Sequence, residues 1–230
     1  MNEAVVLLSG GMDSSVTTAI AINENNKVNL IHITYRHRTA ERELKAFNDI
    51  ADYYNIKNRL VVDIDYLVKI GGSALIDRNI DIPISQKLTW SNRSEVDRMV
   101  VPLTYVPFRN GNFISIATSW AEVLGAGSIY IGVVYEDSSG YPDTRPEFIK
   151  KMEDAVNAGT KPETKITLKT PIIFLNKKEI VLKGVELKVP FHLTWSCYKN
   201  TDKACGKCDS CLLRIKGFEN AGIKDPIVYL

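Results

Sequence analysis

The chain has 230 residues, of which 45% are hydrophobic and 24% are charged, and its formal net charge is +2. This composition is typical of a globular protein, and the length suits one sizeable α/β domain rather than two large ones. Such a small net charge gives no concentrated basic surface, so we expect no direct binding to nucleic acid. No apolar run approaches the roughly 20 residues that span a membrane and no signal peptide precedes the first predicted strand, so a cytoplasmic protein is expected.

Strands and helices are predicted to alternate along the N-terminal part of the chain. Apolar runs predict strands at 4–8, 29–34 and 60–62, and apolar residues at helical spacing predict helices at 14–24 and 41–54. This alternation is typical of an α/β protein with a parallel, doubly wound sheet and right-handed crossovers. The pattern continues with strands at 104–107, 128–134 and 167–171 and helices at 114–124 and 177–187. Lys177, Lys178 and Lys183 are predicted to form the solvent-exposed face of the last helix.

Residues 64–101 are less regular and contain Gly71-Gly72, Pro83 and the polar tract 91–95. We interpret them as an insertion or lid over the ligand-binding crevice. A solvated surface excursion is the alternative, and the composition fits both.

A glycine-rich loop, Ser9-Gly10-Gly11-Met12-Asp13-Ser14-Ser15, joins the first predicted strand to the first predicted helix. This is where α/β proteins hold a phosphate, because paired glycines let successive N–H groups converge on one anion. The serine hydroxyls can donate to the same oxygens. Asp13 would repel a phosphate unless a divalent cation lay between them, which indicates Mg²⁺. The simpler alternative is a turn in which one serine or aspartate caps the helix.

The loop lacks the lysine and the GK[ST] ending of a P-loop. It resembles the pyrophosphatase loop, SGGxDS, of enzymes that split ATP into AMP and pyrophosphate while activating a substrate as an adenylate. This resemblance predicts that ATP is bound by Leu8, Ser9, Gly10, Gly11, Met12, Asp13, Ser14 and Ser15.

Arg109 and Asn110 lie where a predicted strand gives way to a helix. A guanidinium group in this position can face a bound phosphate. An exposed arginine beside a helix cap is the alternative.

The tract 135–148 is rich in hydrogen-bonding groups and poor in aliphatic ones. Arg145 can grip a carboxylate with two parallel hydrogen bonds, and Asp137 or Asp143 can accept from the amidine edge of a guanine-like ring. The alternative is a solvated loop in which Pro146 starts the next helix.

The four cysteines, Cys197, Cys205, Cys208 and Cys211, form the pattern C-x7-C-x2-C-x2-C. Four thiolates at short spacings suit a closed tetrahedral Zn²⁺ site, and Gly206 allows the tight turn that aims two sulfurs at one metal. An iron–sulfur cluster uses similar spacing, and unliganded thiols are a third alternative. We favour zinc because so short a tail cannot build its own core and benefits from a structural ion.

Several motifs together resemble the QueC family of 7-cyano-7-deazaguanine synthases over nearly the whole chain. These motifs occupy 8–14, 106–110, 139–148, 194–198 and 205–211. The resemblance implies an α/β pyrophosphatase-loop domain of the adenine nucleotide alpha hydrolase-like, Rossmann-like class over 1–190, with a zinc-binding segment over 191–230. It also implies a homodimeric ligase, dependent on ATP, Mg²⁺ and Zn²⁺, that converts 7-carboxy-7-deazaguanine and ammonia to the nitrile, a precursor of queuosine and archaeosine in tRNA.

In this interpretation the catalytic residues are Asp13, Ser14, Arg109 and Arg145, and the substrate is bound by Arg38, Asp137, Tyr141, Asp143 and Arg145. The sequence departs from the family's Tyr-Gly-Gln-Arg-His pattern: Arg36-His37-Arg38-Thr39 follow Tyr35, and Arg38 keeps the arginine's place. Three alternatives remain open. A related enzyme could couple the activated deazaguanine to another acceptor, a tRNA sulfurtransferase could share the loop, or a non-enzymatic protein could bind nucleic acid through a zinc ribbon.

Overall fold

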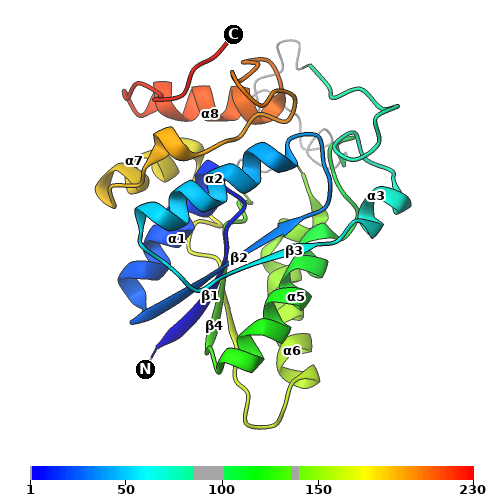
Figure 1. The fold of residues 1–230 in the computed structure, drawn as a ribbon, viewed down its shortest axis with the longest axis vertical. Coiled ribbons are helices and arrows are strands. Elements are labelled where there is room, and N and C mark those ends of the chain that lie inside the picture. The colour runs from blue at the N-terminus through cyan, green and yellow to red at the C-terminus, as the bar shows by residue number, and fades with distance from the viewer. Residues whose placement is uncertain (1, 85–100, 136–139) are drawn as a thin grey trace.

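The computed structural model describes residues 2–84, 101–135 and 140–230, so the candidate Asp137 lies outside the described residues. Five parallel strands form one sheet in the order β3-β2-β1-β4-β5 (Figure 1). The strands are β1 Glu3–Leu7, β2 Lys27–Thr34, β3 Arg59–Asp63, β4 Ser128–Ile131 and β5 Thr167–Lys169. This order is that of a doubly wound sheet, so the predicted fold class is confirmed.

The central strand β1 pairs with β2 on one side and with β4 on the other. Val6 of β1 lies opposite Leu30 of β2 and opposite Tyr130 of β4. The chain runs outward from β1 through β2 to β3, then returns past β1 to add β4 and β5. The connections that follow β1 and β4 therefore diverge, which opens the crevice where doubly wound proteins bind their ligands.

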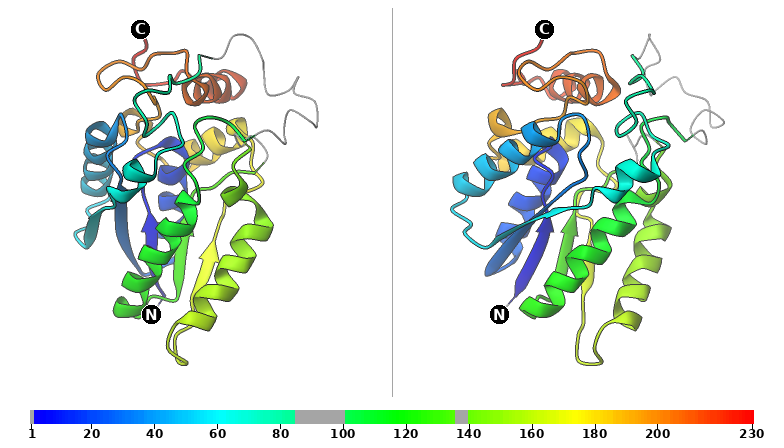
Figure 2. Two further views of the ribbon diagram at one scale, coloured as in Figure 1. Left: turned by 90° about the vertical axis from the view of Figure 1, so that its right-hand side faces the viewer. Right: turned by 45° about the vertical axis from the view of Figure 1, so that its right-hand side comes forward.

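Helices cover both faces of the sheet. The α-helices are α1 Met12–Glu24, α2 Ala40–Tyr53, α3 Tyr66–Ile70, α5 Arg109–Leu124, α6 Pro146–Gly159, α7 Lys177–Glu186 and α8 Asp209–Asn220, and the 3-10 helices are η2 Pro142–Thr144 and η3 Phe191–Leu193. Because side chains alternate along a strand, Val6 packs toward α2, where it joins Phe47, while Val5 packs toward α5, where it joins Ile114. Figure 2 shows α5 and α6 together on one side of the strands and α1 and α2 on the other.

The C-terminal helices α7 and α8 pack against each other at one end of the molecule, next to α1 (Figure 1). Val16 of α1, Ile180 of α7 and Phe218 of α8 belong to one buried cluster. The start of α7 agrees with the prediction because Asn176 and Glu179 form a reciprocal capping box. The tail therefore contributes a helix to the hydrophobic core.

Residues 104–107 do not form the predicted strand. The N–H of Tyr105 donates to Pro102 O at 2.9 Å, which turns the chain, and Phe108 adopts a left-handed conformation with a φ of 54° just before α5. Prolines at 102 and 107 offer no N–H for strand pairing, so the buried Thr104 packs within a turn. The pattern also did not predict α8, which begins inside the cysteine motif, and β4 ends three residues earlier than predicted.

The described part of the predicted insertion contains α3 and then an irregular stretch that reaches the cysteines. Ile84 forms an isolated antiparallel bridge with Cys208, and Ile82 packs against the cysteine cluster. Residues 85–100 lie outside the described residues, so the predicted lid remains a prediction. Among the helices in the described ranges, none has the length and apolarity needed to cross a lipid bilayer.

Candidate active site

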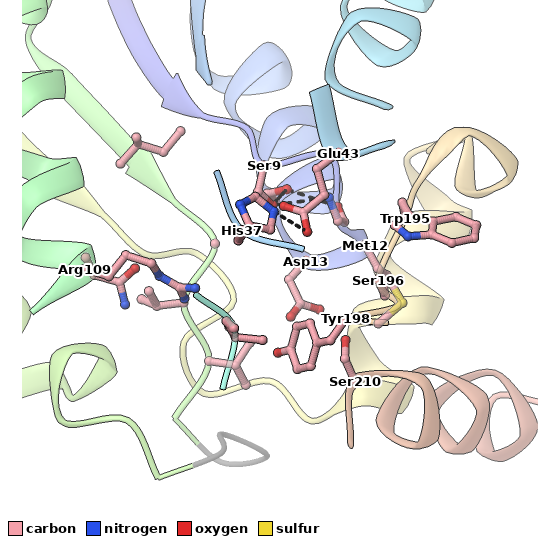
Figure 3. Close-up of a pocket in the computed structure, with 18 of the residues that line it drawn as sticks. Ser9, Met12, Asp13, His37, Glu43, Arg109, Trp195, Ser196, Tyr198 and Ser210 are labelled. Carbon is pink, nitrogen blue, oxygen red and sulfur yellow. Dashed lines mark hydrogen bonds and ion pairs between the residues drawn. The ribbon is translucent and has the colours of Figure 1, made fainter. Parts of the chain in front are cut away.

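A cavity of about 270 Å³ lies at the carboxyl ends of the strands, where the connections after β1 and β4 diverge. Its wall combines the glycine loop, the segment after β2, the start of α5, the segment after β4 and the tail near the cysteines (Figure 3). The cavity therefore brings together segments from along the whole chain, at the edge of the sheet where the fold predicts ligand binding.

The glycine loop can make its turn only because Gly10 has no side chain. Its φ is +89°, and a Cβ atom there would lie 2.7 Å from Glu43 O and 2.8 Å from the Ala46 Cβ in α2. Gly11 then occupies the N-cap position of α1 without a side-chain cap, so the simple alternative of a capping serine or aspartate is not what the structure contains. The first turn of α1 instead presents backbone N–H groups and the positive end of the helix dipole to the cavity.

Three serine hydroxyls surround this turn. The Oγ atoms of Ser9 and Ser14 are 3.0 Å apart, and Ser9 Oγ accepts from the N–H of Gly11 at 3.3 Å. Ser14 and Ser15 both donate to Gly11 O, at 3.1 and 2.7 Å. Of the eight residues predicted to bind ATP, the cavity is lined by Leu8, Ser9, Gly11, Met12, Asp13 and Ser14. Gly10 packs toward α2 and Ser15 is fully buried, so these two support the loop from behind.

Lys177, predicted to be solvent-exposed, is instead part of the cavity wall. Its Nζ lies 2.6 Å from Asp13 Oδ2, and its side chain is only 13% exposed. The other carboxylate oxygen, Asp13 Oδ1, is buried without a hydrogen-bond partner among the described residues. An unpartnered buried carboxylate oxygen beside an anion-binding loop has the donor chemistry that Mg²⁺ requires. The expected cation therefore fits this position.

Arg109 reaches the cavity from the first turn of α5, as predicted. Its guanidinium donates to the Tyr35 hydroxyl at 3.0 Å and lies about 6 Å from the ring centres of Tyr35, Phe113 and Tyr141. The hydroxyl of Tyr141 donates to Thr104 Oγ1 at 2.8 Å, and both side chains line the cavity. A cation ringed by aromatic side chains suits a flat, anionic ligand.

Asp143 is buried and lies outside the cavity lining. Its Oδ2 accepts from the backbone N–H of Asn110 at 2.8 Å, and its carbonyl accepts from the Asn110 side chain at 3.2 Å. These bonds hold the start of α5, and with it Arg109. Burial raises the pKa of Asp143, and the hydrogen bonds from Asn110 offset only part of that effect.

Arg38 and Arg145, two further residues predicted to bind the substrate, lie in different places relative to the cavity. Arg38 lines the cavity, but its guanidinium donates to the carbonyl oxygens of Ala74, Asp77 and Ile80 at 2.8 to 3.0 Å. It therefore fastens the stretch after α3 to the cavity wall. Arg145 is exposed at the N-cap of α6 and is not among the lining residues. A substrate-binding role for Arg145 stays a prediction.

The cavity also contains residues to which sequence reasoning gave no role. Tyr35, His37 and Glu43 contribute from the segment after β2 and from α2, and Trp195, Ser196 and Tyr198 contribute from the tail. The backbone N–H of Trp195 donates to Gly10 O at 2.8 Å, which fixes the tail to the glycine loop. The Thr194–Tyr198 motif was the available signal for the tail residues, but its contact with the loop depends on tertiary packing.

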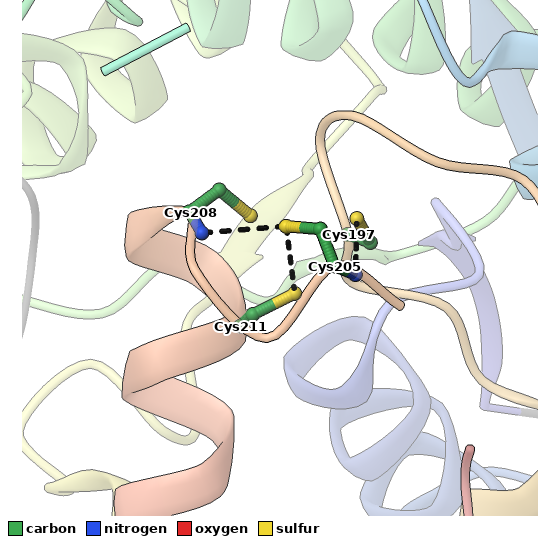
Figure 4. Close-up of side chains that lie close together, drawn as sticks. All are labelled: Cys197, Cys205, Cys208 and Cys211. Atoms are coloured by element: carbon green, nitrogen blue, oxygen red, sulfur yellow. Dashed lines mark hydrogen bonds between the residues drawn. The ribbon is translucent and has the colours of Figure 1, made fainter. Parts of the chain in front are cut away.

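The four cysteines come together as predicted (Figure 4). Their Sγ atoms all lie within 4.8 Å of one another, and all four side chains are buried. Backbone N–H groups of residues 199, 200 and 205 donate to Cys197 Sγ, and those of 207 and 208 donate to Cys205 Sγ, at 3.3 to 3.4 Å. Hydrogen bonds from the Cys208 and Cys211 thiols lower the pKa of Cys197 well below the usual thiol range. Four clustered sulfurs, two of which accept backbone N–H donors, fit a tetrahedral metal site.

The comparisons with known proteins agree with this geometry. The family described as queuosine biosynthesis protein QueC matches residues 3–222. The 7-cyano-7-deazaguanine synthase of Nautilia profundicola is 56% identical over 229 residues, covering 100% of this chain and 99% of that protein. The protein of the same name from a Nitratiruptor species is 53% identical over 99% of this chain and 98% of that protein.

Among solved structures, a 4-thiouridine synthetase in complex with RNA and bound ATP is similar with a TM-score of 0.53 and 20% sequence identity. The match covers 82% of this chain and 41% of that one, so the chain spans less than half of that protein and the likeness supports the fold alone. The family match and the full-length relatives are stronger evidence. They show that this chain belongs to the QueC family.

Proposed function

We propose that the protein is an ATP-dependent ligase that converts 7-carboxy-7-deazaguanine and ammonia to 7-cyano-7-deazaguanine. The observation that carries the proposal is the glycine loop, which aims the first turn of α1 and the Asp13–Lys177 pair into a cavity at the switch point of the sheet. Relatives named 7-cyano-7-deazaguanine synthase that match 99% or more of this chain support the choice of substrate.

The chemistry explains why such a loop is needed. A carboxylate does not exchange oxygen for nitrogen until that oxygen becomes a good leaving group, and transfer of AMP from ATP makes it one. Ammonia then displaces AMP and leaves an amide. A second transfer of AMP, to the amide oxygen, allows that oxygen to leave and the nitrile to form. Both carboxylate oxygens therefore end on AMP.

The glycine loop would bind the phosphates of ATP in both rounds. Backbone N–H groups of the first turn of α1 and the hydroxyls of Ser9 and Ser14 would stabilise the negative charge that develops on pyrophosphate. Lys177 would move from Asp13 to a phosphate oxygen, because its ammonium group already lies at the cavity wall. Mg²⁺, when bound, would neutralise phosphate charge, and Asp13 would hold it through Oδ1, which has no partner among the described residues.

The other end of the cavity would receive the deazaguanine. Arg109 would face the carboxylate, since its charge lies among aromatic rings where a planar ring can stack. Tyr141 and Thr104 form the adjacent wall. We place Asp143 behind this wall, where it positions Arg109 through the start of α5.

We also propose that Zn²⁺ occupies the cysteine cluster and holds the segment 191–230 against the α/β part, 1–190. Cys197 lies between cavity residues, with Ser196 before it and Tyr198 after it, so the metal would stabilise this wall of the cavity. A homodimer and a cytoplasmic location complete the proposal. Light scattering would test the homodimer. Thiols must stay reduced to bind a metal, which is consistent with the reducing cytoplasm.

The decisive experiment uses 7-carboxy-7-deazaguanine labelled with ¹⁸O in both carboxylate oxygens, together with ATP, Mg²⁺ and ammonium. We expect mass spectrometry to find the nitrile and two molecules of ¹⁸O-labelled AMP for each nitrile formed. Absence of both nitrile and AMP would contradict the proposal. Labelled AMP with a conjugate to an added acceptor, and no nitrile, would favour the alternative coupling reaction.

A further inference from the structure

His37, which is buried, and Glu43, which is partly buried, form a pair in the cavity wall that the proposed mechanism has not used (Figure 3). His37 Nε2 lies 3.0 Å from Glu43 Oε1, and the Thr39 hydroxyl donates to the same oxygen at 3.0 Å. The imidazole also stacks on the Tyr35 ring, with 4.4 Å between ring centres. The His37 ring is thus held from one edge and one face.

The Nδ1 edge of the His37 ring contacts no polar partner among the described residues. His37 is only 8% exposed, and neither ring nitrogen makes a hydrogen bond in the described ranges, although Nε2 lies within ion-pair distance of Glu43. A buried polar atom without a partner is costly, so such an atom beside a cavity points to a group that arrives with the ligand. Because Nε2 lies 3.0 Å from a carboxylate oxygen of Glu43, we assign the ring proton to Nε2, which leaves Nδ1 as the basic nitrogen.

The reaction needs such a base. Ammonium brings four protons on its nitrogen, whereas the nitrogen of a nitrile carries none. Two protons leave when ammonium becomes the amide, one more when the amide oxygen receives AMP, and the last when that AMP departs. Each of these protons must pass from the nitrogen to an acceptor in or near the cavity.

Besides His37, the described cavity wall contains the carboxylates of Asp13, Glu43 and Asp209, which are poorly suited to accept these protons. Asp209 begins α8, where the positive end of the helix dipole stabilises its ionised form. Asp13 is paired with Lys177. Burial alone would raise the pKa of Glu43, but His37 and Thr39 lower it overall, which makes this carboxylate a weak base. Histidine is the side chain that takes up and releases protons near neutral pH. Of the three histidines, His192 is exposed and His32 is not a lining residue, so His37 is the one in the described wall.

We propose that His37, held by Glu43, accepts the protons that leave the nitrogen supplied by ammonia. When AMP departs, Nδ1 takes the proton while the nitrogen lone pair forms the new bond to carbon, and the carbon–oxygen bond to AMP breaks. When the amide oxygen attacks the α-phosphorus of ATP, the phosphorus–oxygen bond to pyrophosphate breaks, and Nδ1 takes a nitrogen proton as the carbon–nitrogen double bond forms. Glu43 remains ionised and stabilises the imidazolium until the proton passes to solvent. This inference rests on the proposed function and assigns a role that function leaves open.

The groups that surround His37 set the expected pH behaviour. Glu43 of α2 and Thr39 face one edge of the ring, His32 of β2 interacts with it electrostatically, and Tyr35 covers one face while holding Arg109. At low pH a histidine is already protonated and cannot act as a base. Replacing it should therefore lower the rate of nitrile formation by a smaller factor as the pH falls.

The test compares His37→Asn with the matched variant His192→Asn, whose side chain is exposed. Nitrile formation is measured at fixed free ammonia, and ATP–pyrophosphate exchange is measured without ammonium. We expect His37→Asn to lower nitrile formation roughly a hundredfold or more near neutral pH, because general bases contribute about this much. Exchange transfers no proton from nitrogen, so it should fall far less. His192→Asn should match the unmodified protein in both assays.

Three further readouts separate a base from a structural support. The defect of His37→Asn should shrink as the pH is lowered, and should be smaller with hydroxylamine, a nucleophile that is largely unprotonated at neutral pH. Glu43→Gln should give a smaller defect of the same kind. An equal fall in exchange and nitrile formation, or no fall in either, would overturn the role of His37. If the unmodified protein exchanges pyrophosphate but makes no nitrile, the proposed function itself fails and the inference falls with it.

Discussion

Lys177 Nζ lies 2.6 Å from Asp13 Oδ2, so the first residue of α7 is tied to the first turn of α1 across 164 positions of sequence. The pair is only partly exposed, at 13% for Lys177 and 29% for Asp13. It places one positive and one negative charge beside the N–H groups of the glycine loop. The two side chains can therefore serve a phosphate and a cation separately, and each is expected to show a different kinetic defect.

Replacing Asp13 by Asn should abolish turnover while changing the fold little. The substitution keeps the size of the side chain but removes the charge that would hold Mg²⁺ and that now faces Lys177. Because the pair is partly exposed, we expect the free energy of unfolding to change by no more than about 1 kcal/mol. Nitrile formation and chemical denaturation measure the two quantities. A large loss of stability would contradict a role in cation binding.

Replacing Lys177 by Met should weaken ATP binding and leave the helix in place. Methionine keeps the apolar stem of the lysine side chain. This stem packs closely on Gly217: a Cβ atom added to Gly217 would lie 2.9 Å from Lys177 Cβ. Loss of the ammonium group should raise the KM for ATP roughly tenfold or more, because a charge-assisted hydrogen bond to phosphate is lost. Lys178→Met is the matched control, since Lys178 is exposed and not a lining residue. Equal KM values for ATP in the two variants would show that the Lys177 ammonium group does not contribute to ATP binding.

Replacing Gly10 by Ala should destabilise the protein and damage the loop. The new Cβ would meet Glu43 O and the Ala46 Cβ at less than 3 Å, and the φ of +89° is unfavourable for alanine. Strain and overpacking together predict a loss of about 2–4 kcal/mol in the free energy of unfolding. Gly125→Ala separates backbone strain from overpacking, because Gly125 also has a positive φ, +69°, but has open space around it. Denaturation that finds equal losses in both variants would rule out the contact with α2.

The centre of the sheet could be predicted from sequence because β1, β2 and β4 are largely buried on both faces. These three strands read as apolar runs, and a helix can begin at a recognisable residue, as α7 does at Asn176. The strand predicted at 104–107 was wrong because the burial of these residues comes from a turn and not from a sheet. Its buried residues, Thr104 and Val106, lie between prolines, and burial inside a turn gives the same local pattern as a short strand.

The candidate site was predictable where one local motif carries it and not where tertiary packing does. The glycine loop and the cysteines fall at fixed spacings, and the structure places each set together. Lys177 has the sequence environment of a surface lysine, and only the packing of α7 beside α1 turns it toward Asp13. The partnership of His37 with Glu43 likewise depends on how α2 lies against the segment after β2.

Replacing Cys208 by Ser should reduce metal content, stability and the integrity of the cavity together. One lost ligand weakens a four-sulfur site, and because the backbone of Cys208 forms a β-bridge with Ile84, a loosened site would also loosen the stretch fastened by Arg38. We expect stoichiometric zinc in the unmodified protein, its loss in the variant, and a melting temperature lower by several degrees. Elemental analysis and calorimetry measure these effects, and a visible absorption band would instead identify an iron–sulfur cluster. Lys207→Ser is the matched control, because it alters the same turn and keeps every sulfur. Full metal retention in the Cys208 variant would contradict the assignment of this ligand.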